Sequence, residues 1–111
     1  MAEIKIYLLT CEAIPLRPRP HLGLFDYGLA KVWVQAKGPD EALLFAVTYL
    51  VEFGLTPRSL EKPPMETTAA DYSGQMADLA RFRKAENSGV ALHLDGYSPG
   101  LRPFPVNVTL H

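Results

Sequence analysis

The chain lacks most of the features that identify a protein class from sequence. It has 111 residues but one cysteine, Cys11, which excludes an internal disulfide. No apolar run approaches the roughly 18 to 20 residues of a membrane-spanning helix, and the first residues do not resemble a secretion signal. With 11 Lys and Arg against 12 Asp and Glu, the formal net charge is −1. We therefore expect no membrane or nucleic-acid partner and a cytoplasmic location.

Catalytic and metal-binding motifs are also missing. There is no glycine-rich phosphate loop, no pair of Cys or His at metal-ligand spacing, and no hydrolase signature. The sequence thus predicts no metal site and no cofactor, and favours a protein that is not an enzyme. Triads are defined by geometry and not by spacing, so a small enzyme of unknown class is the alternative, with Cys11, His21 or His93 as its reactive group.

What the chain does contain is enough apolar sequence for one core. Hydrophobic residues make up 48% of it, which fits a single α+β domain over residues 1–111. Prolines at 15, 18 and 20 predict a proline-rich loop or arm at about 13–24. An irregular tail is predicted from about 97, in which Val106, Val108 and Leu110 either add a short edge strand or lie across the domain.

The segment 38–54 predicts a helix that is apolar on almost every side. Pro39, two early carboxylates and Gly54 mark its ends. On a helical wheel only Glu41, Thr48 and Glu52 form a polar stripe. Such a helix must be covered on more than one side, by the domain, a second copy or a partner. The side chains that border the stripe, which we take as a candidate oligomer interface, are Leu44 and Phe45.

Strands are predicted at 4–11, 29–36 and 90–94, and a second helix at 70–86 after a capping box formed by Thr68 and Asp71. Segment 56–68 contains three prolines, which are compatible with one edge strand, two short strands or a loop. The order is β-β-α-(β)-α-β. It predicts an α+β fold with a small mixed or antiparallel sheet and two helices packed on one face. If 56–68 forms two strands, the order becomes ferredoxin-like with an extra N-terminal strand.

One face of this sheet has no predicted helix over it. Aromatic rings, a titratable group and polar donors on such a face are typical of a ligand site or an interface, although loops of the chain itself can also cover it. The candidate ligand-binding residues that alternation assigns to this face are Tyr7, Lys31, Trp33, Gln35 and His93.

These patterns favour a non-catalytic binding or regulatory module that acts as a homo-oligomer. A small apolar ligand on the open sheet face is part of the same hypothesis. The proline and arginine segment 16–20 offers a third interpretation, recognition of a protein partner, because extended proline-rich segments dock into aromatic grooves.

Overall fold

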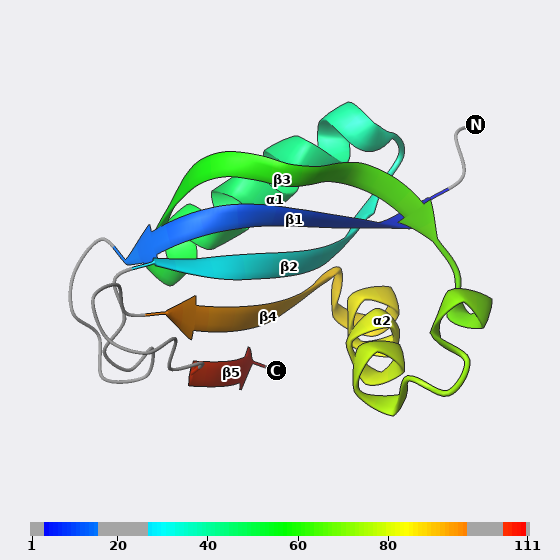
Figure 1. Cartoon of the computed structure of the whole chain (residues 1–111). Helices are drawn as coiled ribbons and strands as arrows, with labels where there is room; N and C mark the ends of the chain where they lie inside the picture. The colour runs from blue at the N-terminus through cyan, green and yellow to red at the C-terminus, as the bar shows by residue number, and fades with distance from the viewer. Residues whose placement is uncertain (1–3, 16–26, 98–105, 111) are drawn as a thin grey trace.

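A computed structural model describes residues 4–15, 27–97 and 106–110, and its centre is an antiparallel sheet with the strand order β3-β1-β2-β4-β5 (Figure 1). This confirms the predicted α+β fold with two helices. The elements, in chain order, are β1 (Lys5–Pro15), β2 (Tyr27–Ala36), α1 (Pro39–Phe53), β3 (Leu55–Thr67), the 3-10 turn η2 (Ala69–Tyr72), α2 (Met76–Ser88), β4 (Val90–Tyr97) and β5 (Val106–Leu110).

The pairing of β1 with β2 decides which side chains share a face. Leu9 lies opposite Val32 and Cys11 opposite Ala30, whereas Leu8 lies opposite Trp33. Leu9 and Cys11 therefore belong to the Val32 face, and Leu8 belongs to the Trp33 face. Both faces of β1 are apolar, so alternation along this strand could not tell which face meets which side of β2.

Helix α1 packs on the Val32 face. It buries Ala42, Ala46 and Leu50, and the small alanine side chains let the helix approach the sheet closely. Helix α1 contacts mainly β3 and β2, the two strands on either side of β1, so it lies across this part of the sheet. The buried residues of this cluster are Leu9, Cys11, Ala13, Ala30, Val32, Ala46, Leu50, Leu55, Leu92 and Leu94.

Turn η2 and helix α2 pack on the opposite face, around Trp33. The buried cluster there contains Ile6, Trp33, Tyr72, Phe82, Ala85 and Ala91. Figure 1 shows α1 on one side of the sheet and α2 on the other. The predicted placement of both helices on one face is therefore corrected. An apolar stripe along a helix shows only that the helix is covered and not which face of a sheet it covers.

Segment 55–67 is one edge strand, β3, with irregular pairing to β1 at three points. Pro57, Pro63 and Pro64 are tolerated because an edge strand does not need every backbone N–H. A single strand between the helices rules out the ferredoxin-like order for the described residues. The predicted helix 70–86 is split into η2 and α2, because Gly74 between them has a φ of 78°, a left-handed conformation that glycine adopts readily.

Two predicted boundaries change. Strand β1 continues to Pro15, so residues 13–15 of the predicted arm are extended strand and the rest of the arm lies outside the described residues. Strand β4 continues to Tyr97, and β5 pairs with it as the predicted short edge strand. Among the described residues no helix is long and apolar enough to cross a membrane.

Candidate functional site

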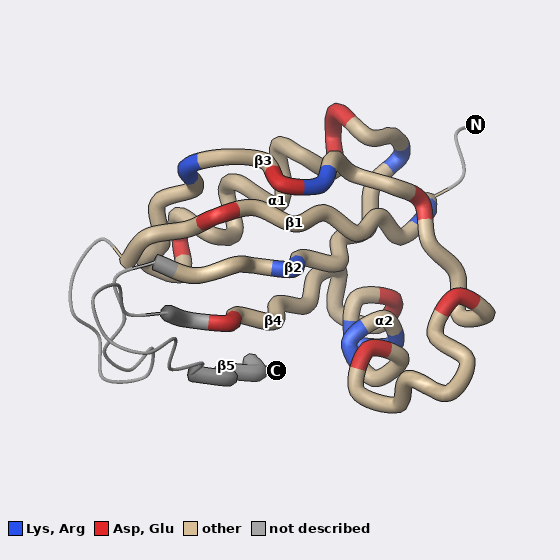
Figure 2. Tube along the Cα trace, in the orientation of Figure 1, with Lys and Arg blue, Asp and Glu red and all other residues tan. Residues whose placement is uncertain are grey.

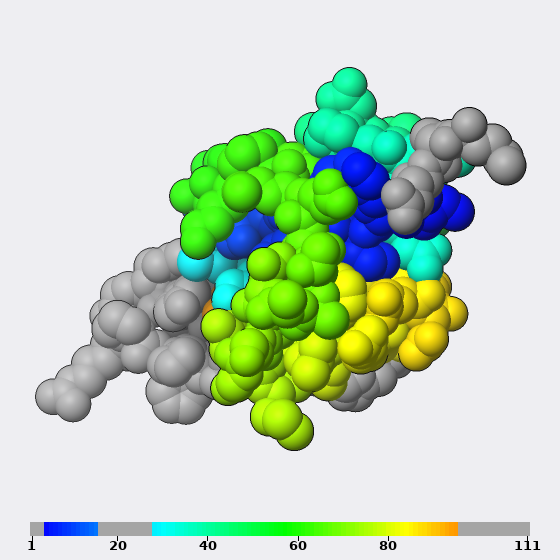
Figure 3. Space-filling model, turned by 90° about the vertical axis from the view of Figure 1, so that its right-hand side faces the viewer, coloured from blue at the N-terminus to red at the C-terminus, as the bar shows by residue number. Residues whose placement is uncertain are grey.

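A recess of about 440 Å³ lies between β3, η2 and the exposed part of the sheet face. We call it the β3–η2 recess. In Figure 3 atoms of β1 and β2 are visible between β3 and η2. Its size falls within the usual range of small-molecule sites, roughly 300–1,000 Å³. The lining residues come from four elements and are Leu8, Thr10, Lys31, Lys62, Pro63, Met65, Glu66, Thr67, Asp71 and Tyr72.

Two lysines and one threonine form a row across this recess. Thr10 of β1 pairs with Lys31 of β2 on one side and with Lys62 of β3 on the other. Neighbouring strands are about 4.8 Å apart, so the two lysine backbones are about 10 Å apart. In Figure 2 blue segments on β2 and β3 lie on either side of β1. Within the described residues neither ammonium group has an ion-pair partner, and the hydroxyl of Thr10 has no hydrogen-bond partner although the residue is only 7% exposed.

The two carboxylates that line the recess are already engaged. Lys5 Nζ donates to Glu66 Oε1 at 3.3 Å. The carboxylate of Asp71 accepts from the Thr68 amide at 2.8 Å, as in the predicted capping box of η2, and also accepts from the Thr67 hydroxyl at 3.0 Å. These hydrogen bonds, that of the Thr68 amide first, lower the pKa of Asp71. The recess therefore offers unpaired positive charge more than unpaired negative charge.

A chain of hydrogen bonds fixes the η2 wall of the recess to the sheet. Trp33 Nε1 donates to the Tyr72 hydroxyl oxygen at 2.9 Å, and the Tyr72 and Thr67 hydroxyl oxygens are 2.7 Å apart. Thr67 has one hydroxyl hydrogen, which goes to the Asp71 carboxylate, so Tyr72 must donate to Thr67. The wall is thus held by a series of hydrogen bonds that begins with the indole N–H as donor and ends with the Asp71 carboxylate as acceptor.

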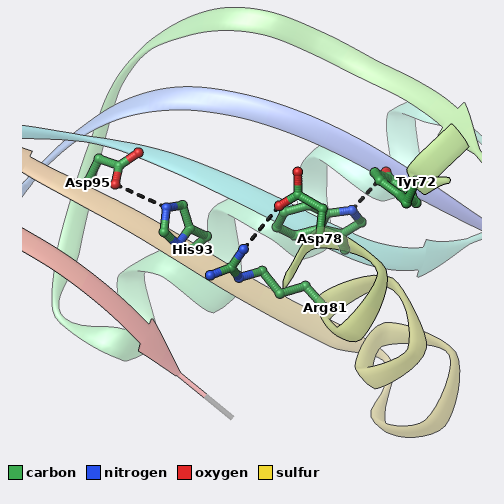
Figure 4. Close-up of polar contacts among 6 residues, drawn as sticks. Tyr72, Asp78, Arg81, His93 and Asp95 are labelled. Carbon is green, nitrogen blue, oxygen red and sulfur yellow. Dashed lines mark hydrogen bonds and ion pairs between the residues drawn. The ribbon is translucent and has the colours of Figure 1, made fainter. Parts of the chain in front are cut away.

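A second polar group lies farther along the same face, where α2 meets β4 (Figure 4). His93 Nε2 is 3.0 Å from Asp95 Oδ1, and Arg81 of α2 pairs with Asp78 at 3.0 Å. Burial, the positive charge of Arg81 and that of Lys31 lower the pKa of His93, against the opposing effect of Asp95. His93 Nδ1 is buried and has no hydrogen-bond partner in the described part of the chain. The neutral imidazole is the favoured form at this position.

The structure brings together only part of the predicted ligand set. Lys31 and His93 are paired across β2 and β4 on the face opposite α1. Tyr7 instead lies on the α1 face, buried with Val34, so its assignment to the open face was wrong. Trp33 is on the expected face but is fully buried beneath η2 and α2.

Gln35 is held by α2. Its Nε2 donates to the backbone carbonyl of Glu86 at 2.6 Å, which ties the end of β2 to the end of this helix. Its side chain therefore has a structural partner already, and it is not among the residues that line the β3–η2 recess.

On the other side of the molecule, the outward surface of α1 carries exposed apolar side chains. Leu44 is 63% exposed, Val51 49% and Phe45 44%. We call these three residues the α1 outer face. A hollow of about 350 Å³ lies on its β4 side, lined in part by Phe45 and Tyr49, and one of about 150 Å³ lies on its β3 side, lined in part by Leu43 and Val47.

The candidate catalytic groups are not assembled. Cys11 is buried beneath α1, and burial raises its pKa to about 11, so the thiol is protonated at neutral pH. His93 lies on the opposite face of the sheet, and His21 lies outside the described residues. No group of three or more Cys, His, Asp or Glu that could hold a metal ion occurs among the residues described.

Sequence reasoning missed most of the recess. Thr10 and Lys62 become neighbours of Lys31 only through strand pairing. Lys62 also lies in segment 56–68, for which the sequence allows one strand, two strands or a loop. Tyr72 lies within 70–86, which the sequence predicts as one continuous helix, and its hydroxyl partners are 5 and 39 residues away. The capping box was the one local signal, because it correctly located the turn that forms the wall of the recess.

Comparison of the chain with protein-family models, with curated proteins and with solved structures finds no match. The proposals below rest on the geometry and chemistry described above.

Proposed function

We propose that this protein is a non-catalytic binding module that acts as a homodimer through the α1 outer face. The observation that carries the proposal is the exposure of Leu44, Phe45 and Val51 on a single helix. Isolated exposed apolar side chains are common on protein surfaces, whereas several on one helix mark an interaction surface. Phe45 lies on the other side of the polar stripe of Glu41, Thr48 and Glu52 from Leu44 and Val51. Leu44 and Val51 are seven residues apart, two helical turns, and therefore point in nearly the same direction.

A second copy is the partner that this surface fits best, because it carries both projections and hollows. Leu44 and Val51 project from the helix, and the two hollows flank it on its β3 and β4 sides. In a two-fold symmetric pair the same surface meets itself, so the side chains of one copy would enter the hollows of the other. A helix of 15 residues is about 22 Å long, and the flanking hollows enlarge the surface available for contact.

The charges of α1 fit the rim of such an interface. Asp40 and Glu41 lie in the first turn and Glu52 in the last, and the helix has no basic residue. Two copies that cross near the middle of the helix would bury Leu44 and Val51 and keep the carboxylates at the periphery. Because these are like charges, salt should screen their repulsion and strengthen association.

The alternative, a small enzyme, has less support. Its candidate thiol at Cys11 is buried and protonated, and Cys11 and His93 face opposite sides of the sheet. A thiol that stays protonated at neutral pH is a poor nucleophile.

Sedimentation velocity across the micromolar range tests the homodimer. We expect the wild-type protein to dimerise more tightly at high salt, and the variants Leu44→Glu and Val51→Glu to be monomers with unchanged circular dichroism. Met76→Glu is the matched control, because Met76 is an apolar side chain 81% exposed on α2, across the sheet. A wild-type monomer at every concentration, or dissociation by Met76→Glu as well as by Leu44→Glu, would contradict the proposal.

A further inference from the structure

We propose that the β3–η2 recess binds a small amphipathic anion, with a carboxylate-like head between Lys31 and Lys62 and an apolar body toward Leu8, Met65 and Tyr72. This site does not depend on the homodimer, because it lies on the sheet face opposite α1. Both sites can be occupied in the same molecule.

The head of the ligand is specified by the row Lys62, Thr10, Lys31. Two ammonium groups on flexible stems that start about 10 Å apart can converge on one anion above the strand between them. Thr10 lies on that strand. Its hydroxyl lines the recess without a partner among the described residues, so it is available to donate to the same anion.

The carboxylates of the lining do not compete for this position. Glu66 is paired with Lys5, and Asp71 accepts two hydrogen bonds within its own turn. A cationic ligand would have to break these interactions, whereas an anion meets ammonium groups that have no partner within the described structure. The charges of the lining therefore favour an anionic ligand over a cationic one.

The body of the ligand is specified by the apolar part of the lining. Leu8, Pro63, Met65 and the ring of Tyr72 line the recess beyond the lysines, and Met65 is 66% exposed. Methionine adapts its shape to irregular ligands, and burial of its side chain by an alkyl or aromatic group would be favourable. A purely apolar ligand, as the sequence suggested, would leave the two ammonium groups without a counter-ion.

The tested ligand is hexanoate, compared with hexanol and hexylamine of the same length and with inorganic phosphate. We expect hexanoate to bind most tightly by calorimetry and to shift the amide resonances of Thr10 and Lys31. Lys31→Gln and Lys62→Gln should each weaken hexanoate binding about five- to tenfold, because each removes one charge-assisted hydrogen bond that solvent partly screens. Lys37→Gln, at an exposed position outside the recess, should leave binding unchanged.

Four results would overturn the proposal. Equal binding of hexylamine or hexanol would remove the role of the negative head, and equal binding of phosphate would remove the role of the apolar body. Undiminished binding to both lysine variants, or shifts confined to other regions, would place the ligand elsewhere. Lys62 is exposed and its substitution leaves the core intact, so the Lys62→Gln variant gives a result even if Lys31→Gln folds poorly.

Discussion

The indole of Trp33 in β2 is hydrogen-bonded to the hydroxyl of Tyr72 in η2, and the ring of Tyr72 also packs against Trp33 at a centroid distance of 6.4 Å. This contact fixes a four-residue turn to the middle of the sheet. Because η2 forms one wall of the β3–η2 recess, the geometry of the recess depends on a pair of side chains that lie mostly beneath it.

Replacement of Tyr72 by Phe tests this dependence. The variant keeps the ring but removes the oxygen that accepts from Trp33 Nε1, and it leaves a buried donor unsatisfied. We expect the free energy of unfolding to fall by about 1–3 kcal/mol, measured by urea unfolding with Trp33 fluorescence. Tyr7→Phe is the control, since Tyr7 is equally buried and its hydroxyl has no hydrogen bond with the described residues. Equal losses in both variants would contradict the assigned role of Tyr72.

Two leucines of α1 should respond differently to truncation. Leu50 is fully buried against the sheet, so Leu50→Ala removes apolar contacts and leaves a cavity, at a cost of about 2–5 kcal/mol in unfolding free energy. Leu44→Ala, on the same helix but 63% exposed, should change the stability of the monomer by no more than about 0.5 kcal/mol. Thermal and urea unfolding at the lowest workable concentration compare them. A large loss for Leu44→Ala would show that Leu44 belongs to the core.

The pH dependence of stability should carry a contribution from His93. Its pKa is lowered from an ordinary value of 6.5, chiefly by burial and by the charge of Arg81, with a smaller effect of Lys31, and Asp95 opposes the shift. The unfolded chain therefore binds a proton more readily than the folded protein. Stability is fully present above about pH 6.5 and is lost as the pH falls from there toward the lowered pKa. Urea unfolding from pH 7.5 to about 5.5 should show this loss.

The variant His93→Gln isolates that contribution, because it keeps a polar side chain that does not titrate. We expect a flatter dependence of unfolding free energy on pH in the variant than in the wild type. Identical slopes in the two proteins would contradict the lowered pKa.

Thiol chemistry should distinguish a binding module from the enzymatic alternative. With a pKa of about 11, Cys11 has almost no thiolate at neutral pH, and α1 covers it. We expect the native protein to react with a disulfide reagent much more slowly than free cysteine, and at the ordinary rate once unfolded in urea. Native Cys11 that reacts faster than free cysteine would instead support a nucleophile.

The elements of this fold were predictable where the signal is local. Pro39 and Gly54 bound α1 as expected, and the Thr68–Asp71 capping box begins η2. The pairing of faces was not predictable. β1 has apolar residues on both sides, so Leu9 and Leu8 are equivalent in the sequence, and only the contact with Val32 or Trp33 separates them. The same pairing places Tyr7 on the α1 face, because Tyr7 and Leu9 lie on the same side of β1.

The two proposed binding surfaces also differ in how far the sequence could predict them. The narrow polar stripe of α1 led to Leu44 and Phe45, and both are exposed. The recess could be reached only through Lys31, because its other polar members lie up to 41 residues away from Lys31 along the chain. No local pattern links Thr10, Lys62 and Tyr72. They come together because β3 pairs with β1, although β2 and α1 lie between these two strands in the sequence.

The prolines of β3 affect more than the shape of that strand. An uncovered sheet edge can recruit an identical edge from another molecule and start a growing fibre, and the prolines of this edge strand, Pro57, Pro63 and Pro64, have no amide hydrogen to donate in such pairing. Arg58, Glu61 and Lys62 add charge along the same edge. The β3 edge is thus poorly suited to strand-to-strand growth, so the association proposed for α1 would not extend through this edge.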